Sequence, residues 1–266
     1  MRSSIITLAV FVLLAIAAAV RAQEIVTVST RDGVTQSFLL TAPADGKAAA
    51  VAVLFPGGPG LIRLRTEEGR IRFGEGNFLV RARQQFVDRG VAAAVMDAPS
   101  DQPRGMDDLF RLGDKHALDV ARVSEEIKRR FPGLPVFLVG TSRGTVSAAA
   151  AARALGDSVA GVVLTSSLFI GARAGPGLSG FDYTKIKAPV LLVHHAEDGC
   201  KFTPYHEARR LAEARQYPLI TVSGGKSPTS DPCEAFSAHG YLGKETETVD
   251  AIVNWMLKKP YPTSVD

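Results

Sequence analysis

The stretch VFLVGTSRG, residues 136–144, decides how this sequence folds. It opens with four apolar residues of strand character, and an alanine-rich segment with helical character, residues 147–155, follows it. Between strand and helix lies the pattern Gly-x-Ser-x-Gly around Ser142, in the strand–turn–helix setting that gives this pattern its meaning. The bare pattern occurs by chance in chains with 25 glycines, so its position is what counts. We predict a turn so tight that larger side chains beside the serine would collide, with the Ser142 hydroxyl projecting from it.

Apolar runs on both sides of this stretch predict a mostly parallel sheet, because nearly continuous apolar runs are typical of strands buried on both faces. We predict strands at 48–55, 91–96, 135–139, 160–165, 189–193 and 218–222. Helical periodicity fills the gaps and predicts helices at 77–88, 115–130, 145–155, 204–215 and 245–257. This alternation predicts a doubly wound α/β fold with helices on both faces. In such sheets the active groups gather beyond the carboxyl ends of the strands.

The N-terminal part of the chain differs from this pattern. Residues 24–30 and 35–42 are β-rich and flank Asp32-Gly33, a pair that favours a tight hairpin, so we predict an antiparallel edge there. No repeat, low-complexity tract or linker divides residues 23–266, which favours a single domain.

Residues 1–22 are typical of a signal peptide. Arg2 precedes an apolar run at residues 5–20 without Asp or Glu, and the small residue Ala22 suits the cleavage position. The alternative is an uncleaved membrane anchor, because the run is near the lower length limit for crossing a bilayer. We expect cleavage after Ala22, export to a periplasmic or extracellular location, and no membrane contact afterwards.

The composition excludes several classes of protein. In 266 residues, 46% are hydrophobic and 22% charged, as in an ordinary globular protein. A formal charge of +4 does not indicate a nucleic-acid partner. No histidine, cysteine and carboxylate spacing matches a metal site, and no glycine-rich loop matches a nucleotide cradle, so we expect neither metal nor cofactor.

Acid and base groups follow Ser142 in the order that serine hydrolysis needs, since a serine hydroxyl is a weak nucleophile until an oriented base takes its proton. Asp198 lies in the loop after the strand predicted at 189–193, and His239 lies in a loop before the last helix. The order Ser, Asp, His is that of α/β-hydrolases. The histidines at 116, 194 and 206 have ordinary structural or solvated interpretations, and His195 could line the mouth of the site.

On these motifs the chain resembles α/β-hydrolase fold enzymes over residues 24–258, nearly all of the expected mature protein. The resemblance implies Ser142 as nucleophile, His239 as general base and then acid, and Asp198 as the carboxylate that holds the imidazole. Glu197 is the nearest rival to Asp198 as the acid.

The resemblance extends to the oxyanion hole, two backbone amides that stabilise negative charge on a carbonyl oxygen. The turn PGGPG, residues 56–60, follows the strand predicted at 48–55 and resembles the glycine-rich turn of lipases, esterases and proline iminopeptidases. It implies the amide of Gly58, with Gly57 as the alternative, and the amide of Arg143.

Two cysteines, Cys200 and Cys233, remain in a chain that we expect to be exported. An even pair in an oxidising compartment favours one disulfide, and two free buried thiols are the alternative.

Two loops indicate what kind of substrate the site can take. Residues 166–187 are too short and too rich in glycine for a helical cap, so we expect little or no cap and an open site. Residues 57–76 form a long irregular stretch with four arginines and three glutamates, which favours a solvated charged loop over an anion site. Asp97 lies at a strand end, and we expect it to stabilise a loop through hydrogen bonds rather than to take part in catalysis.

The sequence therefore predicts an exported serine esterase for small-molecule ester or acyl substrates, working through an acyl-enzyme. A serine peptidase is the alternative enzyme, although the missing cap counts against it. A binding protein that kept the fold without catalysis is the alternative of another class. A dehalogenase is disfavoured because a serine, not an aspartate, occupies position 142. The oligomeric state is not predicted.

Overall fold

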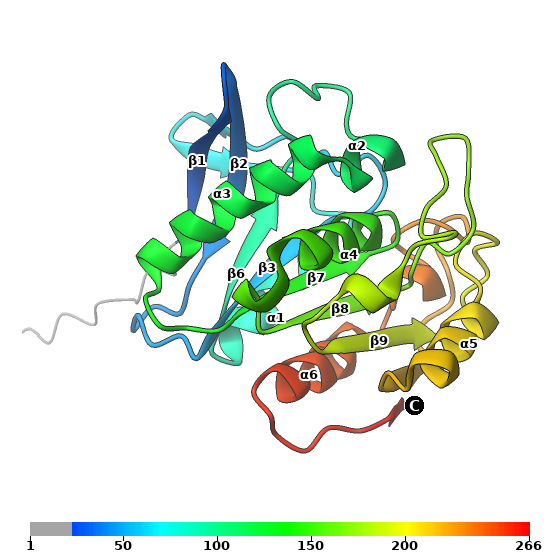
Figure 1. Ribbon diagram of the computed structural model, residues 1–266. Coiled ribbons are helices and arrows are strands. Elements are labelled where there is room, and N and C mark those ends of the chain that lie inside the picture. The colour runs from blue at the N-terminus through cyan, green and yellow to red at the C-terminus, as the bar shows by residue number, and fades with distance from the viewer. Residues whose placement is uncertain (1–22) are drawn as a thin grey trace, which may run out of the picture.

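A nine-stranded sheet runs through the protein, and helices cover both of its faces (Figure 1). The structure is a computed structural model that describes residues 23–266; the predicted signal peptide falls on residues 1–22, outside the described residues. The strand order is β1-β2-β6-β3-β7-β8-β9-β10-β11. The strands of this sheet are β1 (Gln23–Arg31), β2 (Val34–Thr41), β3 (Ala50–Phe55), β6 (Val91–Met96), β7 (Val136–Thr141), β8 (Gly161–Thr165), β9 (Val190–His195), β10 (Leu219–Val222) and β11 (Ser264–Val265).

The sheet is parallel except at its N-terminal edge. β1 pairs with β2, and β2 with β6, in antiparallel register, and every other neighbouring pair is parallel. Asp32 and Gly33 form the predicted hairpin turn, where Gly33 has a φ of 64° that glycine adopts without strain. The predicted fold class, a mostly parallel α/β sheet with an antiparallel N-terminal hairpin, is therefore confirmed.

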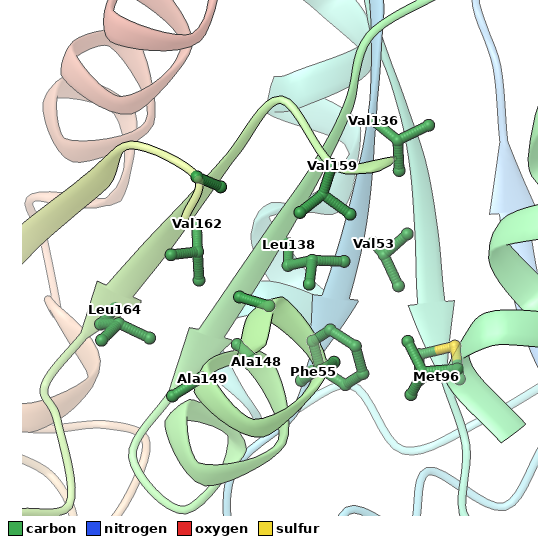
Figure 2. Packing of buried hydrophobic residues seen from close by; sticks show 14 of the residues in the cluster. Val53, Phe55, Met96, Val136, Leu138, Ala148, Ala149, Val159, Val162 and Leu164 are labelled. Carbon is green, nitrogen blue, oxygen red and sulfur yellow. The ribbon is translucent and has the colours of Figure 1, made fainter. Parts of the chain in front are cut away.

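Two apolar layers fix the helices against the sheet. One contains side chains of α3 (Asp114–Arg130) and α4 (Gly144–Leu155), and the opposite one contains those of α1 (Phe78–Asp88) and α6 (Glu245–Met256). In the first, Ala148 and Ala149 of α4 face Leu138 of β7 (Figure 2). Alanines on this face let α4 pack close to the sheet.

The order of the strands creates a crevice beside β3. The chain passes from β3 to β6 on one side of it and then to β7 on the other, and ligands of open α/β sheets bind where the order reverses in this way. The PGGPG turn leaves β3 and the Ser142 turn leaves β7 at this crevice.

Four α-helices and β-strands were not predicted. A small ribbon of β4 (Arg65–Glu67) and β5 (Arg70–Arg72) interrupts the stretch 57–76, so the interpretation of that whole stretch as irregular was wrong. The others are the short helix α2 (Asp108–Leu112) and the edge strand β11. Each has few residues, and tertiary contacts rather than periodicity decide such elements.

The loop after β8 carries no cap. Between β8 and β9 the described chain has only one 3-10 turn, η2 (Tyr183–Lys185), and an isolated bridge between Ala172 and Gly175. The expectation of little or no cap is confirmed. Within residues 23–266, none of the helices combines the length and the apolar character needed to cross a bilayer.

Candidate active site

Ser142 sits on a strained turn that two glycines make possible. Its φ is 53°, a left-handed conformation that residues with side chains rarely adopt. A Cβ atom on Gly140 would overlap the carbonyl oxygen of Gly144, and one on Gly144 would overlap that of Phe55 in β3. The turn therefore requires glycine at both positions, and the hydroxyl-bearing residue between them is carried to the carboxyl edge of the sheet.

Asp198 and His239 are in direct contact. The Asp198 side chain is fully buried in the turn after β9, and its Oδ2 lies 2.9 Å from His239 Nδ1. Oδ2 also accepts a hydrogen bond of 2.9 Å from the Thr203 hydroxyl, and Oδ1 accepts one of 3.0 Å from the Cys200 amide. A buried carboxylate with three donors remains an acceptor, so His239 donates from Nδ1 and leaves Nε2 as the basic nitrogen.

Glu197, the rival acid, lies elsewhere. It is exposed, and its backbone amide donates to Nδ1 of His195, whose Nε2 is 3.0 Å from the carbonyl oxygen of Gly224. His195 is used in this turn and does not line the pocket described below. His194 is also structural: burial lowers its pKa to about 4, and its Nε2 donates to the Thr203 carbonyl oxygen at 2.8 Å.

The histidine loop is held by residues that sequence reasoning missed. The Ser166 hydroxyl donates to the His239 carbonyl oxygen at 2.9 Å, and the Tyr241 hydroxyl donates to the Val193 carbonyl oxygen at 2.8 Å. The Tyr241 hydroxyl also accepts from the Ser166 amide at 3.0 Å, and burial raises the pKa of this phenol. These bonds tie the His239 loop to the ends of β8 and β9. Nearness to His239 in the sequence was the only signal for Tyr241.

A pocket of about 590 Å³ opens at the crevice beside β3. Ser142, Arg143, His239, Gly57 and Gly58 all line it. Much of the remaining wall is apolar, contributed by Leu61, Ile62, Leu168, Phe202 and Phe236. The predicted nucleophile, base and oxyanion residues thus border one cavity.

The two predicted oxyanion amides have no competing acceptor. Within residues 23–266, neither the Gly58 amide nor the Arg143 amide hydrogen-bonds to another protein group, while Gly58 has a φ of 57° that suits glycine. Gly57 is confined because a Cβ there would lie 3.0 Å from Ser142 Cβ. Two unpaired amides on residues that line one pocket can together bind a negatively charged oxygen.

Asp97 holds the chain that leaves the glycine-rich turn. Its carboxylate accepts hydrogen bonds from the amides of Ile62, Arg63 and Leu64 at 2.8, 3.2 and 2.7 Å. The prediction that Asp97 stabilises a loop is confirmed. The four arginines of the stretch 57–76 do not line the pocket, and Arg65 pairs with Glu67 at 2.5 Å.

The side chain of Arg143 turns away from catalysis toward α2. Its Nε lies 3.0 Å from Oδ1 of Asp108, whose side chain is fully buried. Oδ2 of Asp108 accepts a hydrogen bond of 2.8 Å from the Gly177 amide. Asp108 therefore links the turn of Ser142 to the loop after β8, a contact between distant segments that no local pattern announces.

Cys200 and Cys233 are paired at the edge of the pocket. Their sulfur atoms lie 2.07 Å apart, at disulfide distance, and their Cα atoms 4.5 Å apart. The pair connects the turn that carries Asp198 with the loop that carries His239. No group of three or more histidine, cysteine or carboxylate residues in the described part of the chain could hold a metal ion.

Searches with the sequence found no matching family model and no matching curated protein. Solved structures do match. Est1E from Butyrivibrio proteoclasticus superimposes with a TM-score of 0.60 at 16% identity, over 88% of this chain and 98% of that one. Dienelactone hydrolase from Anabaena variabilis gives a TM-score of 0.61 at 15% identity, over 90% and 98% of the two chains.

A third similar structure is an α/β serine hydrolase without a lid from Xanthomonas campestris. It gives a TM-score of 0.59 at 16% identity, over 90% of this chain and 97% of that one. These three matches cover 88 to 90% of this chain and 97 to 98% of the others. The chain has the α/β-hydrolase fold.

Proposed function

We propose that the protein is an exported serine hydrolase that cleaves carboxylic esters or small acyl compounds through an acyl-enzyme. The observation that carries the proposal is the buried contact between Asp198 and His239 at the pocket that Ser142 lines. The similar structures named above include a dienelactone hydrolase and an α/β serine hydrolase, which supports the same reaction class.

The proposed reaction has two steps, acylation of Ser142 and its deacylation by water, and in each step His239 first accepts a proton and then donates it. The Ser142 hydroxyl attacks the substrate carbonyl carbon while His239 Nε2 takes its proton, and the amides of Gly58 and Arg143 stabilise the oxyanion. Collapse breaks the ester bond, and the departing alcohol takes the proton from His239, leaving Ser142 acylated. Water then attacks the acyl carbon while His239 takes its proton; the bond between the acyl carbon and Ser142 Oγ breaks, His239 gives the proton to Ser142, and the carboxylic acid is released. Asp198 orients the imidazole and stabilises its charged form.

The pocket supports a small substrate. A volume of about 590 Å³ lies within the range of small-molecule sites, and the apolar part of its wall suits an uncharged acyl group. Without a cap, the site also lacks the element that in a peptidase of this fold would bind a peptide terminus. We therefore favour esters over peptides.

The test is covalent labelling followed by a substrate panel. Intact mass after reaction with a fluorophosphonate should show one adduct on the wild-type protein and none on Ser142→Ala. p-Nitrophenyl esters of increasing acyl length should be cleaved in preference to aminoacyl anilides. An unlabelled wild-type protein would make this a binding protein, and a preference for anilides would make it a peptidase.

Export is proposed from residues 1–22 and is supported by the paired cysteines, since disulfides persist in oxidising compartments. The experiment is mass spectrometry of protein recovered outside the cytoplasm. We expect a single domain that begins at Gln23; a chain that still carries residues 1–22 in the membrane fraction would support the anchor instead.

A further inference from the structure

A buried arginine lies beneath the glycine-rich turn. Arg111 in α2 is 1% exposed, although arginine is rarely so buried unless it is paired. One Nη donates to the Gly58 carbonyl oxygen at 3.1 Å and the other to the Ser147 hydroxyl at 2.7 Å, and Nε is 3.4 Å from the Met106 carbonyl oxygen. The guanidinium thus joins the turn after β3 to α4, which begins behind Ser142.

The turn is shaped around this guanidinium. A Cβ atom on Gly60 would lie 2.6 Å from the arginine's Nη2, and Gly60 has a φ of 69°. Beside it, the Met106 amide donates to the Pro59 carbonyl oxygen at 2.9 Å. A Cβ on Gly105 would overlap Pro59. The segment that leads into α2 and the glycine-rich turn therefore fit each other along their length, with the arginine at the centre.

The positive charge of Arg111 is not neutralised by a hydrogen-bonded carboxylate in the described chain. The nearby carboxylate of Asp108 contacts Arg143 and the Gly177 amide instead. Burial lowers the pKa of Arg111 to about 9, which leaves it a cation at neutral pH. Burying such a cation is costly, and an apolar side chain would fill the same space at lower cost. A role that needs both the charge and the donors explains its presence.

We propose that Arg111 is a positioning residue for the oxyanion hole: its guanidinium holds the Gly58 carbonyl group, which fixes the backbone on the C-terminal side of the Gly58 amide, and its positive charge favours negative charge at this turn. The inference rests on the proposed function, because it assumes that the Gly58 amide binds an oxyanion. Glycine-rich backbone is the least restricted kind, so Gly58 needs an external partner to hold its amide in one direction. A preorganised donor and a desolvated charge act most strongly in the transition state, when the oxygen becomes negative.

The test compares Arg111→Met, which removes donors and charge, with Arg111→Lys, which keeps the charge without the planar fork. The matched control is Arg31→Met, because Arg31 is also largely buried but, within the described residues, hydrogen-bonds only to the carboxylates of Asp119, at 2.8 Å, and Asp101, and gives no hydrogen bond to the glycine-rich turn. kcat and KM for a p-nitrophenyl ester are measured per active site titrated with fluorophosphonate. Affinity for a trifluoromethyl ketone, which forms an anionic adduct on the serine, is measured alongside.

We expect Arg111→Met to lower kcat about 10- to 100-fold with KM within about twofold, since misplacing one oxyanion donor has effects of this order. Ketone affinity should fall in parallel, and Arg111→Lys should lie between. Arg31→Met should lower Tm and leave kcat unchanged. If Arg111→Met lowers Tm but leaves kcat and ketone affinity at the wild-type level, the inference is wrong.

Two further comparisons keep the result interpretable. If Arg111→Met does not fold, Arg111→Lys and Ser147→Ala, which removes one Arg111 partner, carry the test: a lower kcat supports the inference, and an unchanged kcat in both overturns it. If Ser142→Ala hydrolyses the ester as fast as the wild type, the proposed function itself has failed. Hydrolysis that depends on Ser142 but not on Arg111 refutes only the inference.

Discussion

The pairing of Cys200 with Cys233 predicts a local loss of activity on reduction. The two cysteines are 33 residues apart in the sequence, and in the chain-entropy model closing such a loop contributes about 3 to 4 kcal/mol to the free energy of unfolding. For a protein of this size, that corresponds to a fall in Tm of about 10 °C in a variant with both cysteines replaced by serine. The sheet and its two apolar layers contain neither sulfur, so the secondary structure should survive at 25 °C.

The site should be affected before the fold. The Cys200 amide donates to Asp198 Oδ1, and Cys233 lies six residues before His239, so opening the bridge frees both partners of the acid–base pair. In a titration with dithiothreitol, ester hydrolysis should be lost at a lower concentration than the far-UV circular dichroism signal. Re-forming the disulfide by oxidation should restore the rate of ester hydrolysis.

Two results would refute this reasoning. If activity and circular dichroism decline together, the bridge supports the whole fold and not the site. If unfolded protein that has not been reduced titrates with two free thiols, the bridge does not form. Cys200→Ser and Cys233→Ser as single variants should match the double variant in kcat, because either one opens the bridge.

Three further changes have sharp expected outcomes. Asp198→Asn should lower kcat by about 10⁴-fold, as expected when the imidazole loses the carboxylate that sets its tautomer, whereas Glu197→Gln should stay within about twofold in the same ester assay. Tyr241→Phe removes a buried hydroxyl that has several hydrogen bonds. It should lower the free energy of unfolding by about 2 kcal/mol in urea titrations, and it should also lower kcat in the ester assay. His116 is buried with both ring nitrogens unpaired, and burial lowers its pKa to about 3, so stability present above the unfolded pKa of about 6.5 is lost as pH falls. His116→Leu should therefore reduce the loss of unfolding free energy between about pH 6 and pH 4 by up to about 1.4 kcal/mol per pH unit, and an unchanged slope in urea titrations across that range would contradict it.

Most of the fold could be predicted from the sequence because the decisive patterns are local. The strand predicted at 91–96 coincides with β6, and the helix predicted at 77–88 differs from α1 only by Asn77, whose side chain caps that helix. Each of these segments carries its own apolar periodicity, and the order of strands and helices limits the topology to very few choices. The Ser142 turn was predictable for the same reason, since its glycine pattern lies within five consecutive residues, although the contact between Gly144 and Phe55 does not.

The supporting residues could not be predicted in this way. Arg111, Asp108 and Tyr241 act on partners 53, 69 and 48 residues away in the sequence. Nothing near Arg111 in the chain distinguishes it from a solvated arginine on a short helix. The roles of such side chains depend on which loops meet at the carboxyl edge of the sheet, and single-sequence patterns do not contain that information.

Because Asp97 accepts hydrogen bonds from three successive amides, the segment that follows them is a suitable site for inserting a foreign peptide. The ribbon of β4 and β5 extends beyond these amides, its ends are exposed, and Gly69 at its tip has a φ of 72° with open space around it. A peptide epitope or a small reporter inserted at this tip would lie beyond the residues that Asp97 holds, so the glycine-rich turn before them should keep its conformation. The same arrangement would let evolution lengthen the ribbon into a specificity loop, one residue at a time, without disturbing the turn that precedes it.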